Sequence, residues 1–411
     1  MINSQTISLR YGRGTEEFRI PAAADILDIR EPQRSVSPTT FRLGLADLLP
    51  AVIPEGQIAI VVADKTRLCD YPTILPWLVE ILEERGIEQR RIVFYIAYGN
   101  HAPQTDGESL GAYGQIFHDS PFIHHQSTEP NLFVELGMTS RGTPVRMRKD
   151  LMAAGLILTV GAISHHYFAG FGGGRKLLFP GLGEQQAIYH NHRLYLDPHR
   201  CTLAPGCLPG QLDGNPLAED LAEVDQLLPP YLSIHGLLNS QGEMAACRFG
   251  RTYEDFLRVC QEHDGYFRAG TCKQYDLVLA STGGYPKDIN MIQSHKAIDN
   301  GAAFVRDGGS LILLAECPDG IGSTTFLPYF EMGGWESTFG HLAGNYSGNG
   351  GTALAMMAKT RRITLYLMTA LDQALCKRIG ITRVNRPQVT NLLAHDQQSV
   401  AVIRNSSMLI R

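Results

Sequence analysis

Several kinds of segment that would indicate particular classes of protein are missing from this 411-residue sequence. No run of 18 uninterrupted apolar residues occurs, so we expect no transmembrane helix. The first twenty residues contain no apolar signal-peptide core, so we expect the chain to stay in the cytoplasm. The formal net charge is only −5, which predicts neither a nucleic-acid partner nor a membrane partner.

Cysteine pairs and standard nucleotide-binding motifs are also missing. None of the eight cysteines forms a CxxC pair, so we expect free thiols rather than a zinc or dithiol site. Neither GxxxxGK[ST] nor GxGxxG with an acidic residue about twenty positions later occurs, which disfavours a P-loop enzyme and a dinucleotide-dependent dehydrogenase. Apolar residues make up 44 % of the chain and charged residues 19 %, a composition typical of folded proteins rather than disordered ones.

The pattern that is present predicts an α/β protein. Continuous apolar runs of strand length alternate with helical stretches, which is typical of mostly parallel sheets covered on both faces. The strands are expected at 58–64, 92–99, the end of 151–164, 275–282 and 309–316, with a helix at 72–87 and a hairpin in the first 20 residues. We expect two α/β domains, 1–268 and 269–411, with the active site in a cleft between them. Whether the tail 399–411 returns to the first domain is left open.

Polar side chains directly follow four of the predicted strands. They are Asp64 to Arg67, Asn100 with His101, His165 with His166, and the segment from Pro286 that leads to Gln293 and Lys296. Ligands of open α/β sheets bind outside the carboxyl ends of the strands, so four such groups suggest one shared site. Each group alone is also compatible with a helix cap, a turn histidine or a solvated helix face.

A glycine-rich string at 165–181 is the most distinctive single feature. Gly172, Gly173 and Gly174 precede Arg175 and Lys176, an arrangement in which backbone N–H groups and two cations suit a phosphate. A glycine-rich surface turn is the alternative. Farther on, His190 and His192 are two residues apart and would lie on different faces of a helix, which makes them a poor metal-binding pair.

Taken in order, these motifs resemble the nickel-dependent lactate racemase family of 2-hydroxy-acid racemases and epimerases. The matching segments are DKTR at 64–67, GNH at 99–101, HYFAGFGGGRK at 166–176, NH at 191–192 and GGYPKDINMIQSHK at 283–296. The resemblance implies a nickel-pincer nucleotide, a pyridinium mononucleotide with two sulfur-bearing arms, held covalently by Lys176 through a thioamide. It implies that His192 is the protein ligand of nickel. Further cofactor contacts would come from Thr66, Gly172, Gly173 and Gly174.

The resemblance also implies how the reaction proceeds. Hydride leaves Cα for the cofactor, a 2-keto acid forms, and hydride returns to either face. The hydroxyl proton must leave on one side and return on the other, so His101 and His166 would be paired acid/base groups, with Asp64 orienting a neighbouring histidine. The substrate would be bound by Arg67, Ile292, Gln293 and Lys296. The enzymes that build the cofactor are expected partners.

Departures from the family pattern predict a substrate other than lactate. Leu68, Cys69 and Asp70 stand where prolines are usual, and Ile292 stands where the lactate enzyme has a tyrosine. Serine is common at Gly172 and proline at His165. We therefore expect a larger or more polar 2-hydroxy acid, with His165, His295 and Asn345 as additional polar candidates. The alternatives are a lactate racemase proper, a nicotinamide-type dehydrogenase and a non-catalytic cofactor-binding relative.

Overall fold

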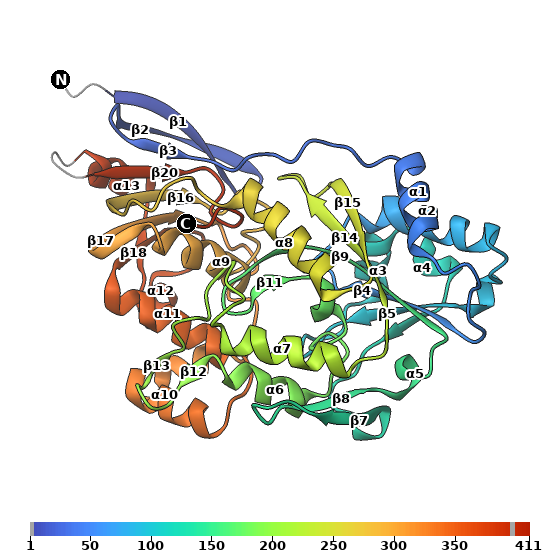
Figure 1. Cartoon of the computed structure of the whole chain (residues 1–411). Coiled ribbons are helices and arrows are strands. Elements are labelled where there is room, and N and C mark those ends of the chain that lie inside the picture. The colour runs from blue at the N-terminus through green and yellow to red at the C-terminus, as the bar shows by residue number, and fades with distance from the viewer. Residues whose placement is uncertain (1–3, 395–398) are drawn as a thin grey trace. The chain divides into compact units, whose positions relative to one another are not determined.

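The computed structural model describes residues 4–394 and 399–411, which form two compact units (Figure 1). Unit 1 comprises Met1–Arg30, Tyr195–Pro205 and Gly265–Arg411, and unit 2 comprises Glu31–Leu194 and Gly206–Asp264. This division differs from the expected domains 1–268 and 269–411, because the N-terminal segment belongs with the C-terminal unit. Residues 1–3 and 395–398 of the expected domains lie outside the described residues.

Unit 2 is built on a six-stranded sheet with the order β15-β14-β9-β4-β5-β6. Its strands are β4 (Ile58–Ala63), β5 (Ile92–Ala97), β6 (Phe122–His124), β9 (Leu156–Ala162), β14 (Leu232–Leu238) and β15 (Met244–Gly250). All neighbours pair in parallel except β14 and β15, and every residue of β4 is buried. The continuous apolar runs therefore became central parallel strands, as the sequence predicts.

The remaining elements of unit 2 flank this sheet and connect its strands. The helices are α1 (Pro38–Leu48), α2 (Tyr71–Glu84), η1 (Gln89–Arg91), α3 (Asp106–Tyr113), α4 (Ile116–Asp119), η2 (Pro130–Leu132), α5 (Lys149–Met152), η3 (Gly174–Leu177), α6 (Gln185–Arg193) and α7 (Pro216–Leu227). Two small hairpins are β7 (Phe133–Met138) with β8 (Pro144–Arg148), and β10 (Ser164–His166) with β11 (Gly170–Gly172). Helix α8 (Tyr253–Phe267) ends the unit and leads into unit 1.

Unit 1 contains a second six-stranded sheet, entirely parallel, with the order β19-β18-β17-β16-β20-β3. Its strands are β3 (Asp25–Leu27), β16 (Tyr275–Ser281), β17 (Val305–Leu314), β18 (Thr364–Met368), β19 (Thr382–Val384) and β20 (Val400–Ile403). The other elements are β12 (Leu196–Asp197), β13 (Thr202–Leu203), α9 (Met291–Ala302), η4 (Leu327–Glu331), α10 (Trp335–Gly344), α11 (Gly350–Arg362), α12 (Gln373–Arg378) and α13 (Arg386–Leu393). The tail thus adds strand β20 between β16 and β3, so it pairs with an N-terminal segment inside unit 1.

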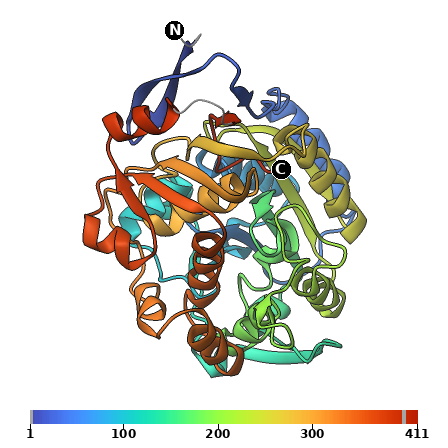
Figure 2. The same cartoon turned by 90° about the vertical axis from the view of Figure 1, so that its left-hand side faces the viewer.

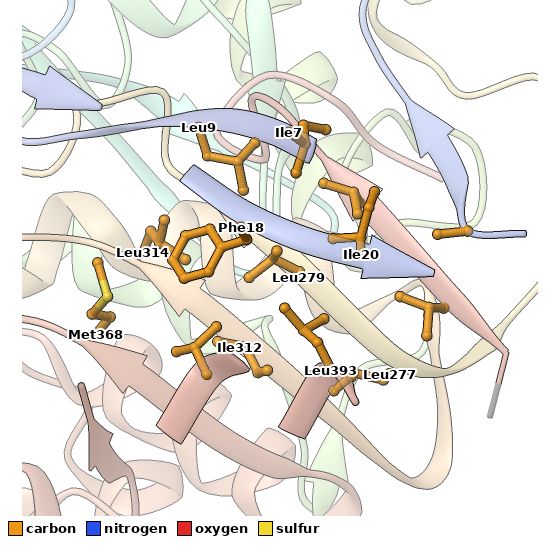
Figure 3. Packing of buried hydrophobic residues seen from close by; sticks show 14 of the residues in the cluster. Ile7, Leu9, Phe18, Ile20, Leu277, Leu279, Ile312, Leu314, Met368 and Leu393 are labelled. Carbon is orange, nitrogen blue, oxygen red and sulfur yellow. The ribbon is translucent and has the colours of Figure 1, made fainter. Parts of the chain in front are cut away.

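The N-terminal hairpin of β1 (Ser4–Tyr11) and β2 (Gly14–Pro21) covers one face of this second sheet. Figure 3 shows Leu9 and Phe18 of the hairpin turned toward Leu279 and Leu314 of the sheet, and all four side chains are buried. In Figure 2, α13 lies beside the hairpin, where Arg386 donates a hydrogen bond of 3.0 Å to the carbonyl of Glu17. Apolar burial therefore ties the first residues of the chain to its last strands.

Across residues 4–394 and 399–411, none of the helices has both the length and the apolar character needed to cross a bilayer.

Candidate active site

Three neighbouring strands of unit 2 bring the predicted polar residues to one edge of the sheet. Strands β9, β4 and β5 are adjacent and parallel, so their carboxyl ends lie side by side. Asp64 directly follows β4, His101 follows β5 after a short turn, and His166 lies in β10 just after β9. Because the chain runs from β4 to β5 on one side and returns to β9 on the other, this edge is a topological switch point of the kind that binds ligands.

Asp64 and His101 form a tight hydrogen-bonded pair. The Nδ1 atom of His101 lies 2.6 Å from Oδ2 of Asp64, while Oδ1 of Asp64 accepts from the backbone N–H and the hydroxyl of Thr66 at 2.9 and 2.6 Å. Burial opposes the charge of Asp64, but the hydrogen bond and charge of His101 outweigh it and lower the pKa of the carboxyl. A carboxylate only accepts hydrogen bonds, so Nδ1 of His101 carries the proton and Nε2 of the neutral ring has a free lone pair.

His166 is held in the opposite tautomer. Its Nδ1 atom accepts a hydrogen bond from the backbone N–H of Ala169 at 3.3 Å. A backbone N–H only donates, so Nδ1 is unprotonated and the proton of the neutral ring lies on Nε2. The preceding side chain points elsewhere, as alternation in an extended strand requires: His165 contacts Asp264 at 2.8 Å and packs against the ring of His263.

One aromatic ring, that of Phe168, links three of the predicted site residues. Its centroid lies 4.5 Å from the ring of His166 and 5.1 Å from the ring of His192. The Nζ atom of Lys176 lies over the same ring, 5.5 Å from its centroid. Phe168 is not among the residues predicted for the site, although it lies inside the motif HYFAGFGGGRK. The structure therefore gathers both ends of this motif and the distant His192 around one buried side chain.

The ammonium of Lys176 and the imidazole of His192 are both driven toward their neutral forms. Burial, reinforced by the nearby charges of Arg67 and Arg175, lowers the pKa of Lys176 well below its ordinary value. Burial also lowers the pKa of His192 to about 3, with smaller contributions from Lys176, Arg67 and His101. A neutral amine is a nucleophile and a neutral imidazole is a metal ligand, so both groups are in the state that the expected chemistry requires.

Two of the three consecutive glycines, Gly173 and Gly174, are required by packing of the chain against itself. A Cβ atom on Gly173 would lie 2.2 Å from the carbonyl oxygen of Ala162, and one on Gly174 would lie 2.6 Å from the ring of Phe256. Both residues also have positive φ angles, 76° and 52°. Close internal contacts thus account for these glycines, and their contact with a phosphate, like that of Gly172 and Thr66 with the cofactor, remains a prediction.

The predicted carboxylate-binding residues Gln293 and Lys296 lie on α9 of unit 1. The Nζ atom of Lys296 donates to Oε1 of Gln293 at 2.8 Å, one turn apart on the helix. Ile292 precedes them, and its backbone N–H donates to the carbonyl of Ile321 at 3.1 Å. Their part in binding a substrate remains a prediction. His295 on the same helix is buried, which lowers its pKa well below its ordinary value and disfavours it as a polar substrate contact.

Two residues of a buried polar network beside His192 were missed in the sequence. Asn191 and Asp220 are both fully buried, on α6 and α7, and their side chains are joined by a hydrogen bond of 2.8 Å. Asn191 stands in the NH motif, which was noted only for its histidine. The signal in the sequence is the amide of Asn191 next to a candidate metal ligand. Nothing near Asp220 in the sequence distinguishes it from acidic residues on the surfaces of other helices.

Comparisons with known proteins agree with this architecture. Residues 41–203 match the sequence model of the lactate racemase N-terminal domain, and residues 271–337 match that of the lactate racemase C-terminal domain. The lactate racemase of Thermoanaerobacterium thermosaccharolyticum is 28 % identical over 284 residues, which cover 68 % of this chain and 65 % of that protein. The lactate racemase of Lactiplantibacillus plantarum is 27 % identical over 273 residues, covering 66 % and 63 %. The match spans a little under two thirds of each relative's length.

Solved structures show the same fold. The lactate racemase apoprotein of Thermoanaerobacterium thermosaccharolyticum superposes with a TM-score of 0.85 at 22 % identity, covering 99 % of both chains. A protein from Thermotoga maritima superposes with a TM-score of 0.69 at 15 % identity, covering 93 % of this chain and 99 % of that one.

Proposed function

The chain belongs to the lactate racemase family, and on that premise we propose that it is a racemase or epimerase that inverts C2 of a 2-hydroxy acid. The observation that carries the proposal is the opposite tautomers of His101 and His166. Inversion needs a group that removes the hydroxyl proton on one side and a group that returns it on the other. Nε2 of His101 is prepared to accept a proton, and Nε2 of His166 is prepared to donate one.

Asp64 supports this exchange through His101. When Nε2 of His101 takes the hydroxyl proton, the ring becomes positively charged, and the buried carboxylate 2.6 Å from Nδ1 stabilises that charge. In the reverse direction the roles of the two histidines interchange. The same pair of side chains can therefore serve both enantiomers, which a racemase requires.

The residues around Phe168 fit the nickel-pincer nucleotide that the family resemblance implies. Lys176 is a desolvated, neutral amine and so could form the thioamide link. His192 donates through Nδ1 to the side-chain oxygen of Asn191 at 3.2 Å, which leaves Nε2 available as the single protein ligand of nickel. The chemistry that this group supplies when bound is acceptance and return of the Cα hydride.

In this proposal, three polar side chains bind the substrate carboxylate, and one neighbouring residue differs from that of the lactate enzyme. The guanidinium of Arg67 can form two parallel hydrogen bonds to the substrate carboxylate, and Lys296 with Gln293 would add charge and a donor. An aliphatic Ile292 replaces the tyrosine of the lactate enzyme. Together with the other departures from the family pattern, this difference supports a substrate larger or more polar than lactate.

The test is an inversion assay on protein co-produced with the cofactor-building enzymes and nickel. Intact mass measures the covalent adduct, and chiral chromatography follows single enantiomers of lactate, malate, 2-hydroxyglutarate, phenyllactate and gluconate. We expect inversion of at least one acid. His101→Ala and His166→Ala should keep the adduct and lose roughly 100-fold or more in rate, because each removes one proton-transfer group. Lys176→Ala should lose the adduct.

His118→Ala is the matched control, because His118 is exposed on α4 of the same unit and touches none of the site residues described above. It should leave both the adduct and the rate unchanged. Full inversion activity in His101→Ala and His166→Ala would contradict the two-histidine proposal. A nickel adduct without inversion of any acid would contradict the proposed activity on this class of substrate.

A further inference from the structure

We infer that Asp220, acting through Asn191, sets the tautomer of His192 and thereby keeps its Nε2 atom unprotonated for metal binding. The metal-binding part of this inference rests on the proposed function, whereas the tautomer itself can be measured independently. Asn191 and Asp220 are positioning residues in this scheme, since neither would touch substrate or cofactor.

Three donors converge on the carboxylate of Asp220. The hydroxyl of Thr139 donates to Oδ1 at 2.5 Å, and the hydroxyl of Thr143 donates to Oδ2 at 2.7 Å. The third donor is the side-chain amide of Asn191, whose Nδ2 lies 2.8 Å from Oδ2. Asp220 and Asn191 are both 0 % exposed, so no water competes for these bonds. A carboxylate in this position accepts from all three neighbours and can donate to none of them.

This acceptor fixes which way the amide of Asn191 faces. Nδ2 is directed at two acceptors, Oδ2 of Asp220 and the carbonyl of Leu217 at 3.4 Å. The amide oxygen must then face the other way, where it lies 3.2 Å from Nδ1 of His192. An amide oxygen only accepts, so Nδ1 carries the ring proton and Nε2 keeps its lone pair. The carbonyl of Ile188, one turn earlier on α6, is a second acceptor for the ring.

The network is also anchored from outside, so that its geometry does not depend on His192. Thr139 and Thr143 flank the turn between β7 and β8, and the backbone N–H of Thr143 donates to the hydroxyl of Thr139 at 3.0 Å. Within the same turn, Arg141 forms ion pairs with two glutamates of α7, Glu219 and Glu223. Hydrogen bonds from the second nitrogen of a metal-binding histidine to acceptors of this kind are a common way to orient the ligand.

The experiment measures the tautomer directly in the full chain prepared without cofactor. Histidine labelled with ¹⁵N is incorporated, and long-range ¹H–¹⁵N correlation distinguishes the protonated ring nitrogen from the unprotonated one. The ring signal that disappears from the spectrum of His192→Gln is assigned to His192. We expect Nδ1 to be protonated in the parent protein, and we expect Asn191→Leu and Asp220→Asn to introduce a population protonated on Nε2. Thr159→Val is the control, because it removes a buried hydroxyl that bonds to Ser233 outside the network.

Two results would overturn the inference. One is a parent protein whose His192 is protonated on Nε2. The other is an unchanged tautomer in both Asn191→Leu and Asp220→Asn, provided that at least one of them is folded by circular dichroism, since the Ile188 carbonyl alone would then be sufficient. In enzyme that carries the adduct, Asn191→Leu should release nickel about 10- to 100-fold more readily on dialysis. If no adduct forms at all, the proposed function fails, while the tautomer measurement still decides this inference.

Discussion

At the scale of single residues, the tautomer of each candidate-site histidine follows from the hydrogen-bond partner of its Nδ1 atom. His101 and His166 are chemically identical, yet a carboxylate beside the first and a backbone N–H beside the second give their rings opposite tautomers. His192 receives its tautomer from an amide. His101 and His192 therefore carry the ring proton on Nδ1, whereas His166 carries it on Nε2, because of hydrogen bonds of 2.6, 3.2 and 3.3 Å.

A fourth histidine, His125, should make stability depend on pH. Its side chain is buried, with Nε2 3.0 Å from the carbonyl of Gly183, and burial lowers its pKa from 6.5 to about 4. Between those values the unfolded chain binds a proton that the folded chain does not, so stability falls as the pH decreases from about 6.5 to about 4. The full effect is roughly 3 kcal/mol.

Urea unfolding at a series of pH values checks this prediction. His125→Gln cannot take up the proton, so its free energy of unfolding should fall less between neutral pH and about pH 4 than that of the parent protein. His118→Gln, at an exposed position, is the control and should follow the parent. Equal pH dependence in His125→Gln and the parent would show that His125 titrates alike in the folded and unfolded chains.

At the scale of elements, the turn from β11 into η3 depends on glycine for two separable reasons. Gly173 has a φ of 76°, and a Cβ there would also overlap the carbonyl oxygen of Ala162 at 2.2 Å. Gly142, in the β7–β8 turn, has a similar φ of 81°, but a Cβ there would meet only an ordinary contact at 3.6 Å. Comparing the two separates steric overlap from backbone strain.

We expect Gly142→Ala to cost about 1–2 kcal/mol, which is the penalty of the left-handed conformation alone. Gly173→Ala should cost more, by at least about 1 kcal/mol, because the backbone of either β9 or η3 must also move. Thermal unfolding followed by circular dichroism measures both. Equal destabilisation by the two substitutions would mean that the overlap at Gly173 is relieved without further strain. Internal packing would then not be the reason for glycine at this position.

At the scale of the whole molecule, residues from the two ends of the chain share one core. Phe18 is 2 % exposed and packs with Leu279 and Leu314, which are about 260 and 300 positions away in the sequence. Phe18→Ala should therefore cost about 3–5 kcal/mol, the usual range for removing a buried aromatic ring. Leu43→Ala, at a position 67 % exposed on α1, should cost no more than about 0.5 kcal/mol.

Chemical denaturation monitored by far-ultraviolet circular dichroism tests this pair. If the hairpin is an integral part of the unit 1 core, the transition that reports the second sheet should shift to lower urea concentration in Phe18→Ala. A loss confined to the hairpin, with the rest of the unfolding curve unchanged, would contradict the packing seen in Figure 3.

The sequence by itself determined the features that depend on short-range pattern. Continuous apolar runs indicated buried parallel strands, since a strand covered on both faces needs apolar side chains at every position. The polar residues that follow β4, β5 and β9 indicated a site at the strand ends, because parallel strands bring those ends together. Alternation along an extended strand likewise separated His165 from His166.

Only the tertiary structure decided which distant residues meet. Residues up to Arg30 belong with unit 1 because strand β3 pairs with β20 and the β1–β2 hairpin covers the sheet, choices made by apolar burial between segments hundreds of residues apart. The carboxylate of Asp220 reaches Asn191 because α6 packs on α7. Local periodicity carries no information about such contacts. Because Asp220 accepts from the amide nitrogen of Asn191, the amide oxygen faces His192 and accepts from its ring. The tautomer of His192 thus depends on Asp220, a three-dimensional neighbour that none of the motifs contains.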